Sequence, residues 1–183
     1  FYVGVDKRLN NLQHHNLFFD ADFDQHAKEI YDNPKWPKNP LFYLSCPSIT
    51  DPSLAPKGNE NLMFLIPLAP GLEDTNEMRE KYFDIVLKRL RDLTGNDIEK
   101  NIIFKKSYCV NDFEKDYNSY KGNAYGLANT LRQTAILKPR MKNKKIKNLY
   151  YTGQLTVPGP GVPPSIISGQ IAAIEIDKYL NKL

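Results

Sequence analysis

The sequence has few cysteines and no long hydrophobic run, and each absence removes a class of protein. Its two cysteines, Cys46 and Cys109, lie far apart among 183 residues, without CxxC spacing and without a nearby histidine pattern. This usage excludes a zinc finger and a dithiol redox motif, and it fits reduced cysteines in a reducing compartment. No apolar run approaches the roughly 20 residues that a membrane-spanning helix needs. We therefore expect a cytoplasmic chain that does not cross a membrane.

A large charge excess and nucleotide-binding glycines are absent as well. The net charge is +4 and the pI is about 8.9, an excess that is small and dispersed along the chain. It suits an anionic surface but predicts no nucleic-acid partner. The pair His14–His15 has no further ligand at matched spacing, so no metal site is predicted. No GxGxxG triplet follows a strand, so a complete dinucleotide site inside this chain is not expected.

Hydrophobic spacing is what the sequence offers instead. Short apolar runs bounded by turn residues predict strands over residues 1–5, 17–19, 42–46, 62–68, 102–108 and 149–152. Helical spacing and capping residues predict helices over residues 22–31, 76–93 and 164–180, a short helix opened by an Asn111–Glu114 cap pair, and a helical turn over residues 127–131. The chain opens inside a strand and without an initiator Met, so we expect it to be cut from a longer protein.

The order of these elements predicts the fold class. A turn-dense loop over residues 47–58 separates two strands, which favours antiparallel pairing because a parallel pair needs a longer crossover. We expect an α/β or α+β-like fold, with a mostly antiparallel sheet, helices, and a C-terminal strand-loop-helix unit. A basic connector over residues 138–147 marks the predicted domain boundary, which divides the chain into residues 1–137 and 138–183.

The C-terminal strand-loop-helix unit is the segment most suggestive of chemistry. Its glycines leave backbone N–H groups uncovered where a helix begins, and its prolines stiffen the loop. A helix N-terminus offers N–H donors and a partial positive charge, which suit a phosphate or an electron-rich ring edge. A tight strand-to-helix turn that binds nothing would give the same pattern.

Four motifs lie in order across nearly the whole chain. They occupy residues 14–19 (HHNLFF), 48–58 (SITDPSLAPKG), 120–126 (YKGNAYG) and 148–164 (NLYYTGQLTVPGPGVPP), the last followed by Ser168 and Gly169. In sequence, order and spacing they resemble the bacterial-type phytoene desaturase family of carotenoid desaturases. The combination is specific, whereas any one motif alone would be weak.

The resemblance implies an FAD-dependent oxidoreductase that introduces conjugated double bonds into a C40 carotenoid. Residues 1–137 then form a substrate-binding domain truncated at its N-terminal side, and residues 138–183 form the C-terminal segment of the FAD-binding domain. Because the ADP-binding half is missing here, the chain alone is expected to be inactive. In this family the loop rich in Gly and Pro, which is residues 153–164 here, and the helix that follows it flank the flavin. We call this segment the Gly/Pro loop. The resemblance therefore assigns cofactor contacts to Gly153, Gln154, Gly161, Val162, Pro163 and Ile166.

The chain departs from the family pattern at three positions. Leu155 stands where a Gly is usual, Val157 where a His is usual, and Pro164 where a Gly is usual. No catalytic residue is assigned, because the cofactor carries the oxidation step and no Ser-His-Asp order or carboxylate pair stands out.

Two other functions remain open at this stage. A carotenoid isomerase or an amine-oxidase-like flavoenzyme would share much of the fold, and detection of net substrate oxidation separates desaturation from isomerisation. A non-catalytic module that binds a polyene or lipid is the rival from a different class. The sequence sets neither the number of double bonds introduced nor an oligomeric state.

Substrate and membrane contacts complete the expectations. His14, His15 and Tyr125 are candidates for the substrate channel, although surface or structural histidines are the favoured interpretation of the pair. The basic connector over residues 138–147 carries six positive charges in ten residues. A solvated loop is the plain interpretation, and peripheral association with an anionic membrane surface is the functional one. Carotenoids dissolve in bilayers, so an enzyme acting on them must reach a membrane.

Overall fold

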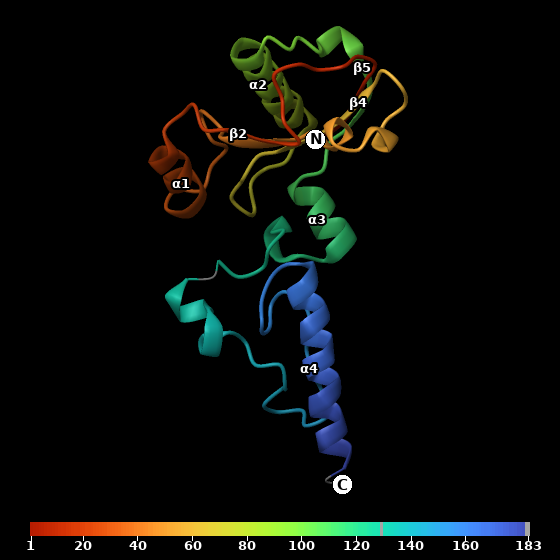
Figure 1. Ribbon diagram of the computed structural model, residues 1–183. Coiled ribbons are helices and arrows are strands. Elements are labelled where there is room, and N and C mark those ends of the chain that lie inside the picture. Colours follow the sequence, from red (N-terminus) through yellow and green to blue (C-terminus); the bar gives the residue numbers. More distant parts are fainter. Residues whose placement is uncertain (129, 182–183) are drawn as a thin grey trace. The chain divides into compact units, whose positions relative to one another are not determined.

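The computed structural model describes residues 1–128 and 130–181, in two compact units (Figure 1). Unit 1 comprises Phe1–Asn123 and unit 2 comprises Ala124–Leu183. The predicted division into residues 1–137 and 138–183 concerns the domains of a complete protein and stays a prediction. No helix of the described residues is long and apolar enough to span a bilayer.

Unit 1 is built on a five-stranded antiparallel sheet, as the sequence predicts. Its strands, in the spatial order β2-β3-β4-β1-β5, are β2 (His15–Phe18), β3 (Phe42–Ser45), β4 (Glu60–Leu65), β1 (Tyr2–Val5) and β5 (Ile102–Lys106). Every pair of neighbours is antiparallel. The first strand in the sequence therefore lies inside the sheet, between β4 and β5.

One face of the sheet packs on α2 (Asn76–Thr94), which Figure 1 shows lying over it. Strand residues alternate between the two faces, and most of those on the α2 side, such as Val3, Leu44 and Phe64, are buried. Phe64 meets Phe83 of α2 edge-on, with 6.4 Å between ring centroids. The buried core consists of Val3, Val5, Leu9, Leu12, Phe18, Phe42, Leu44, Cys46, Leu62, Phe64, Phe83, Val86, Leu90 and Ile98. Burial of these side chains is what stabilises unit 1.

The helix ends of unit 1 follow sequence rules with one exception. Asp22 caps α1 (Phe23–Tyr31) and Thr75 caps α2, each accepting a bond from a first-turn N–H, and Gly95 closes α2 at φ 77°. The predicted Asn111–Glu114 cap of α3 (Val110–Tyr117) is wrong. Cys109 precedes the helix, and its N–H donates to Asp112 Oδ2 at 2.9 Å. The acidic residue three positions after the cap therefore selects the helix start, because it satisfies that N–H.

A buried ion-pair network joins the beginnings of α2 and α3. Arg79 donates two hydrogen bonds of 2.6 Å to Asp74, whose side chain is fully buried, and its guanidinium also lies 2.8 Å from Asp112. The Asn111 N–H donates to Asp74 at 2.9 Å. Burial by itself would raise the pKa of Asp74, but the bonds from Arg79 and Asn111 outweigh it and lower that pKa.

Unit 2 has one long helix and little other regular structure. The helix is α4 (Val162–Leu180), close to its predicted bounds. The strand predicted over residues 149–152 is wrong, because only an isolated bridge joins Tyr150 to Lys142. An apolar run becomes a strand only where a neighbouring strand pairs with it. The helical turn predicted over residues 127–131 includes Asn129, which lies outside the described residues; a 3-10 turn covers Leu131–Gln133.

The net positive charge of the chain comes from unit 2, which has few acidic residues. The sequence of unit 2 contains nine lysines and arginines against two acidic residues, a net charge of +7, so unit 1 carries −3. The expectation of a dispersed excess is therefore wrong. The chain-wide value of +4 hides a strongly basic segment beside a mildly acidic unit.

Candidate functional site

The Gly/Pro loop of unit 2 leads into α4 through glycines in unusual conformations. Gly153 opens the loop at φ 94° and Gly161, which precedes the helix, adopts φ 115°. Residues with a Cβ rarely adopt such values, so these two positions require glycine. At Gly161 a Cβ would also lie 3.3 Å from Pro164. The backbone geometry explains why the motif is glycine-rich at these places.

Two buried hydroxyl groups fix the loop, one by a bond to the helix and one by a bond within the loop. Ser168, fully buried on α4, accepts a 2.7 Å bond from the Gly153 N–H and donates one of 2.7 Å to the Ser165 carbonyl. Thr156, at 2% exposure, donates to the Gly153 carbonyl at 3.1 Å. From the sequence, Ser168 counts only as a small residue of the helix. The structure gives it a specific task, which is to fix the start of the loop.

The first turn of α4 offers fewer donors than the sequence suggests. Pro163 and Pro164 have no N–H group, and the Ser165 N–H donates to the Gly161 carbonyl at 3.0 Å. Val162 is therefore the one residue of the first three that carries an N–H. Because Val162 and Ile166 are 75% and 62% exposed, the helix start presents apolar surface. It suits contact with a ring system better than a cradle for a phosphate.

The six residues assigned to the cofactor lie at the two ends of the Gly/Pro loop and in the first turns of α4. Gly153 and Gln154 are half-buried, while the other four lie exposed at the start of α4. The loop also meets the YKGNAYG motif: a Cβ on Gly126 would lie 2.4 Å from the Leu155 side chain. Gly126, at φ 80°, therefore makes room for Leu155. This contact brings Tyr125, which is 66% exposed, beside the Gly/Pro loop.

The histidine pair forms a stacked cluster at one edge of the sheet in unit 1. The rings of His14 and His15 stack with centroids 4.1 Å apart, and the His15 ring stacks on Tyr43 at 5.9 Å. His15 Nδ1 lies 2.6 Å from the Tyr43 hydroxyl, and His14 Nδ1 lies 2.7 Å from Thr50 Oγ1. The bond between His14 and Thr50 joins two of the family-like motifs, HHNLFF and SITDPSLAPKG. Among the described residues, no group of acidic, histidine and cysteine side chains fits a metal ion.

The sheet face turned away from α2 is largely apolar and open. Residues paired across strands point to the same face, so the register groups Leu17 with Tyr43 and Leu65, and Met63 with Tyr2. Leu17 is 66% exposed and Tyr2 49%. We call this surface the open sheet face; its members are Tyr2, Gly4, His15, Leu17, Tyr43, Ser45, Asn61, Met63, Leu65, Phe104 and Lys106. Lys106 is its one permanently charged residue.

A buried polar cluster anchors the turn-dense loop that follows β3. Ser48 donates its hydroxyl to Glu60 and accepts the Asn61 N–H at 3.0 Å. Glu60, 3% exposed, is also paired with Arg8 at 3.0 Å. Burial raises the pKa of the neighbouring Cys46 thiol to about 11, and the carboxylate adds to that rise, so the thiol stays protonated. Sequence reasoning missed this cluster, although a lone Glu in an apolar strand was the available signal.

Comparison with known proteins shows the family to which the chain belongs. No protein-family model matches the chain. The carotenoid 3,4-desaturase of Haloarcula japonica is 45% identical to it over 172 residues, which cover 94% of this chain and 35% of that protein. The chain belongs to the carotenoid desaturase family.

Other members of the carotenoid desaturase family are more distant. A 4,4'-diapophytoene desaturase (4,4'-diaponeurosporene-forming) of Staphylococcus haemolyticus is 34% identical over 94% of this chain and 36% of its own length. A 4,4'-diapolycopen-4-al dehydrogenase of Metabacillus indicus is 32% identical over 88% of this chain and 33% of its own length. The chain therefore spans about a third of the length of the curated relatives it matches.

The structure assembles two candidate regions, one in each unit. Within unit 2 the structure brings Tyr125 and the Gly/Pro loop together through Gly126 and Leu155. Within unit 1 it brings His14 and His15 together at the edge of the open sheet face. In each region the structure joins residues that lie apart in the sequence, Gly126 with Leu155 in unit 2 and His15 with Tyr43 in unit 1.

Proposed function

We propose that this chain is the C-terminal part of an FAD-dependent carotenoid desaturase that introduces conjugated double bonds into a C40 polyene. The relatives named as desaturases support the reaction class. The observation that carries the substrate proposal is the open sheet face, because it is broad, mostly apolar and held in place by a fully packed core on its other side.

An apolar sheet face suits a polyene for a physical reason. A carotene has no hydrogen-bonding group, so its binding free energy comes from removal of apolar surface from water, at about 25 cal/mol per Å². Aromatic side chains such as Tyr2, Tyr43 and Phe104 add flat surfaces that fit a conjugated chain. His15 holds Tyr43 by its bond to the phenol hydroxyl. In this proposal the pair orients one edge of the surface, and the apolar members exclude water from the substrate.

The α4 start fits the ring system of FAD better than its phosphates. The exposed side chains of Val162, Pro163 and Ile166 would contact the ring, and the N–H of Val162 would be available to a ring-edge acceptor. FAD, when bound, would accept the hydride equivalent released as each double bond forms. Because the sequence has no GxGxxG triplet, the ADP half would be held by residues outside this chain. The chain alone would then be inactive.

The basic connector supports peripheral association with an anionic membrane, in a protein at the cytoplasmic surface. Its six positive charges would each contribute about 1 kcal/mol near an anionic surface. Such a location would bring the enzyme to substrates that dissolve in the bilayer.

The proposal is tested by expression of the complete gene that encodes this chain. The purified protein is assayed on phytoene, on later acyclic C40 carotenes and on 4,4'-diapophytoene. We expect bound flavin in the absorption spectrum and products of lower mass with red-shifted absorption. A rearranged product of unchanged mass would instead identify an isomerase. Binding of the polyene without any product would identify a non-catalytic module.

A matched pair of variants tests the open sheet face in the same protein. Leu17→Asn changes a residue of that face, whereas Leu93→Asn changes a residue of α2 that is exposed to a similar degree, 52% against 66%. We expect the first change to raise the apparent KM for the polyene about tenfold, since one buried aliphatic side chain is worth about 1.5 kcal/mol or more, and the second to leave KM unchanged. Equal effects would remove the open sheet face from the proposal.

A further inference from the structure

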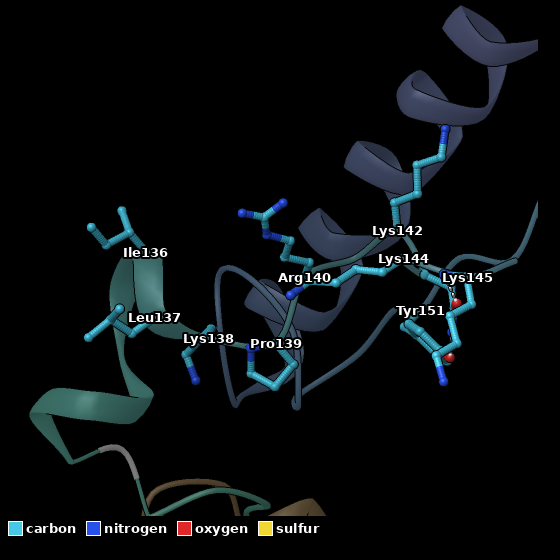
Figure 2. Close-up of a pocket in the computed structure, with 10 residues that line it drawn as sticks. Ile136, Leu137, Lys138, Pro139, Arg140, Lys142, Lys144, Lys145 and Tyr151 are labelled. Atoms are coloured by element: carbon cyan, nitrogen blue, oxygen red, sulfur yellow. Dashed lines mark hydrogen bonds between the residues drawn. The ribbon is translucent and has the colours of Figure 1, made fainter. Parts of the chain in front are cut away.

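Unit 2 contains an open concavity of about 550 Å³ that is lined largely by cations. Figure 2 shows Ile136 and Leu137 on a helical turn at one end and Lys144, Lys145 and Tyr151 at the other, with Lys138, Pro139 and Arg140 between them. We call this feature the basic concavity. None of the six residues assigned to the flavin lines it.

The cations of the basic concavity have no acidic neighbours in the sequence. No Asp or Glu occurs between Asp116 and Glu175. Among the described residues, the ion pairs include none from Arg140, Lys144 or Lys145. Lys142 lies over the Tyr179 ring at 4.6 Å, so its charge is held in place. Arg140, Lys144 and Lys145 therefore form a local positive field, which attracts anions.

An exposed apolar rim borders the same cations. Ile136 is 95% exposed, Leu131 88% and Leu137 57%, all on two consecutive 3-10 turns. Ala135, just before Ile136, adopts φ 48°, a conformation that residues with a Cβ rarely adopt. Backbone strain of this kind is found preferentially at functional positions. Here it accompanies the presentation of an isoleucine to solvent.

We propose that the basic concavity and its apolar rim form a docking site for an anionic lipid bilayer. Headgroup phosphates occupy the concavity beside Arg140, Lys144 and Lys145, while Ile136 and Leu137 enter the interfacial region. This inference rests on the peripheral membrane association proposed above and assigns it to particular residues. It combines the two contributions that interfacial anchors use, which are apolar burial and attraction to anionic headgroups.

The composition of the site favours a bilayer over other anions. A site for free phosphate has no use for fully exposed aliphatic side chains at its edge. A single-stranded nucleic acid would be expected to use aromatic side chains for base stacking, yet the aromatic residue that lines the concavity is Tyr151 alone. The rim contains aliphatic residues instead, which favour lipid.

The test measures binding of this chain to lipid vesicles by a flotation assay. The vesicles are phosphatidylcholine with about a third phosphatidylglycerol, a content that gives an anionic surface potential. We expect binding that weakens with salt and is absent on pure phosphatidylcholine. The triple variant R140Q/K144Q/K145Q should bind roughly 100-fold more weakly, at about fivefold per charge. Ile136→Ser should bind about tenfold more weakly, because its aliphatic side chain no longer enters the interface.

Matched variants separate a local site from general electrostatics. The triple variant K57Q/K100Q/K115Q removes the same charge from exposed positions of unit 1, and Ile103→Ser changes an isoleucine that is 60% exposed on β5. Both should bind vesicles like the unchanged chain. Circular dichroism confirms that each variant is folded; if the basic triple variant unfolds, the Ile136→Ser comparison and the salt dependence still decide.

Several outcomes would overturn the proposal. Equal weakening by the two triple variants would mean that only net charge acts. An unchanged affinity of Ile136→Ser would remove the rim from the site. Displacement by inorganic phosphate at the same phosphate concentration would indicate a site for a free anion, and tighter binding to a single-stranded oligonucleotide would indicate nucleic acid. Vesicle binding needs neither flavin nor activity, so its failure is distinct from a failure of the proposed desaturation.

Discussion

The two units of the chain treat their apolar residues in opposite ways. Every residue of the hydrophobic core cluster lies in unit 1, where the sheet and α2 cover one another. In unit 2 the large aliphatic residues remain outside: Leu131, Ile136, Val162, Ile166 and Ile174 are all more than half exposed. The buried members of unit 2 include Ser168 and Thr156, which fix the Gly/Pro loop by hydrogen bonds.

Unit 1 therefore has a packed hydrophobic core, whereas unit 2 leaves apolar surface open to contact. Unit 1 buries most of one face of its sheet against α2, so the open sheet face rests on a packed core. Unit 2 combines exposed apolar side chains with a net charge of +7. Large exposed apolar areas mark surfaces that contact other molecules or other parts of a protein. The comparison predicts that core substitutions act strongly in unit 1 and weakly in unit 2.

The largest effect is expected from Leu90→Ala in the core of unit 1. Leu90 is fully buried, so the substitution should lower the free energy of unfolding by about 2–5 kcal/mol. Ile174→Ala, on the exposed surface of α4, should change it by less than about 0.5 kcal/mol. Urea unfolding followed by circular dichroism reports both units, and the fluorescence of Trp36, the one tryptophan, reports unit 1 because its ring packs 4.6 Å from Tyr82. Equal effects of the two substitutions would contradict the comparison.

The next effect concerns Asp74 and depends on pH. Asp74→Asn should cost about 1–3 kcal/mol at neutral pH, because Arg79 loses a buried charged partner. The folded pKa of Asp74 lies below its usual 3.8, so its stabilisation is fully present above that value and is lost as the pH falls through the folded pKa. The stability difference between the two proteins should therefore shrink below about pH 4 in urea titrations. A difference that stays constant down to pH 2 would argue against this linkage.

Some elements of the fold could be predicted from the sequence and others could not. The alternating residues of β1 and the helical stripe of α2 predict their elements because local spacing reflects burial. The same spacing rule wrongly predicts a strand over residues 149–152, because local sequence does not show whether a neighbouring strand is present to pair with it. The Cys109–Asp112 start of α3 was missed because several polar residues nearby could cap a helix, and only the tertiary structure selects one.

The candidate site also has features that the sequence could predict and features that it could not. Gly153 and Gly161 could be predicted, because a loop entering a helix needs special backbone conformations there. The bond between His15 and Tyr43 could not, because it depends on the register of β2 on β3. The asymmetric charge was visible in the sequence, but its meaning required the boundary between the units.

A smaller effect is expected where the turn-dense loop joins the sheet. Ser48→Ala removes the hydroxyl that donates to the buried carboxylate of Glu60, so it should cost about 1–2 kcal/mol. Ser53→Ala is the control, because its hydroxyl bonds to the exposed Asp51. Thermal unfolding compares the two variants. The anchoring role would be wrong if both variants unfolded at the same temperature.

The smallest effects are expected at two glycines of unit 2. Gly161→Ala should destabilise the start of α4 by about 1 kcal/mol, since a Cβ at φ 115° is strained. Gly169→Ala should stabilise the same helix by about 0.5–1 kcal/mol, because Gly169 is helical and its Cβ would meet no atom within 4 Å. Helicity measured by circular dichroism during heating distinguishes the two. The same sign for both changes would contradict the conformations described.

The position of β1 between β4 and β5 limits the order in which unit 1 can fold. Tyr2 pairs with Met63 on one side and with Lys106 on the other, so this strand is synthesised long before either neighbour. Until those strands emerge from the ribosome, its apolar residues and unpaired backbone groups stay exposed. Contacts between residues so distant in sequence slow folding and lengthen the period of exposure. We therefore expect unit 1 to complete its fold only after β5 has emerged from the ribosome.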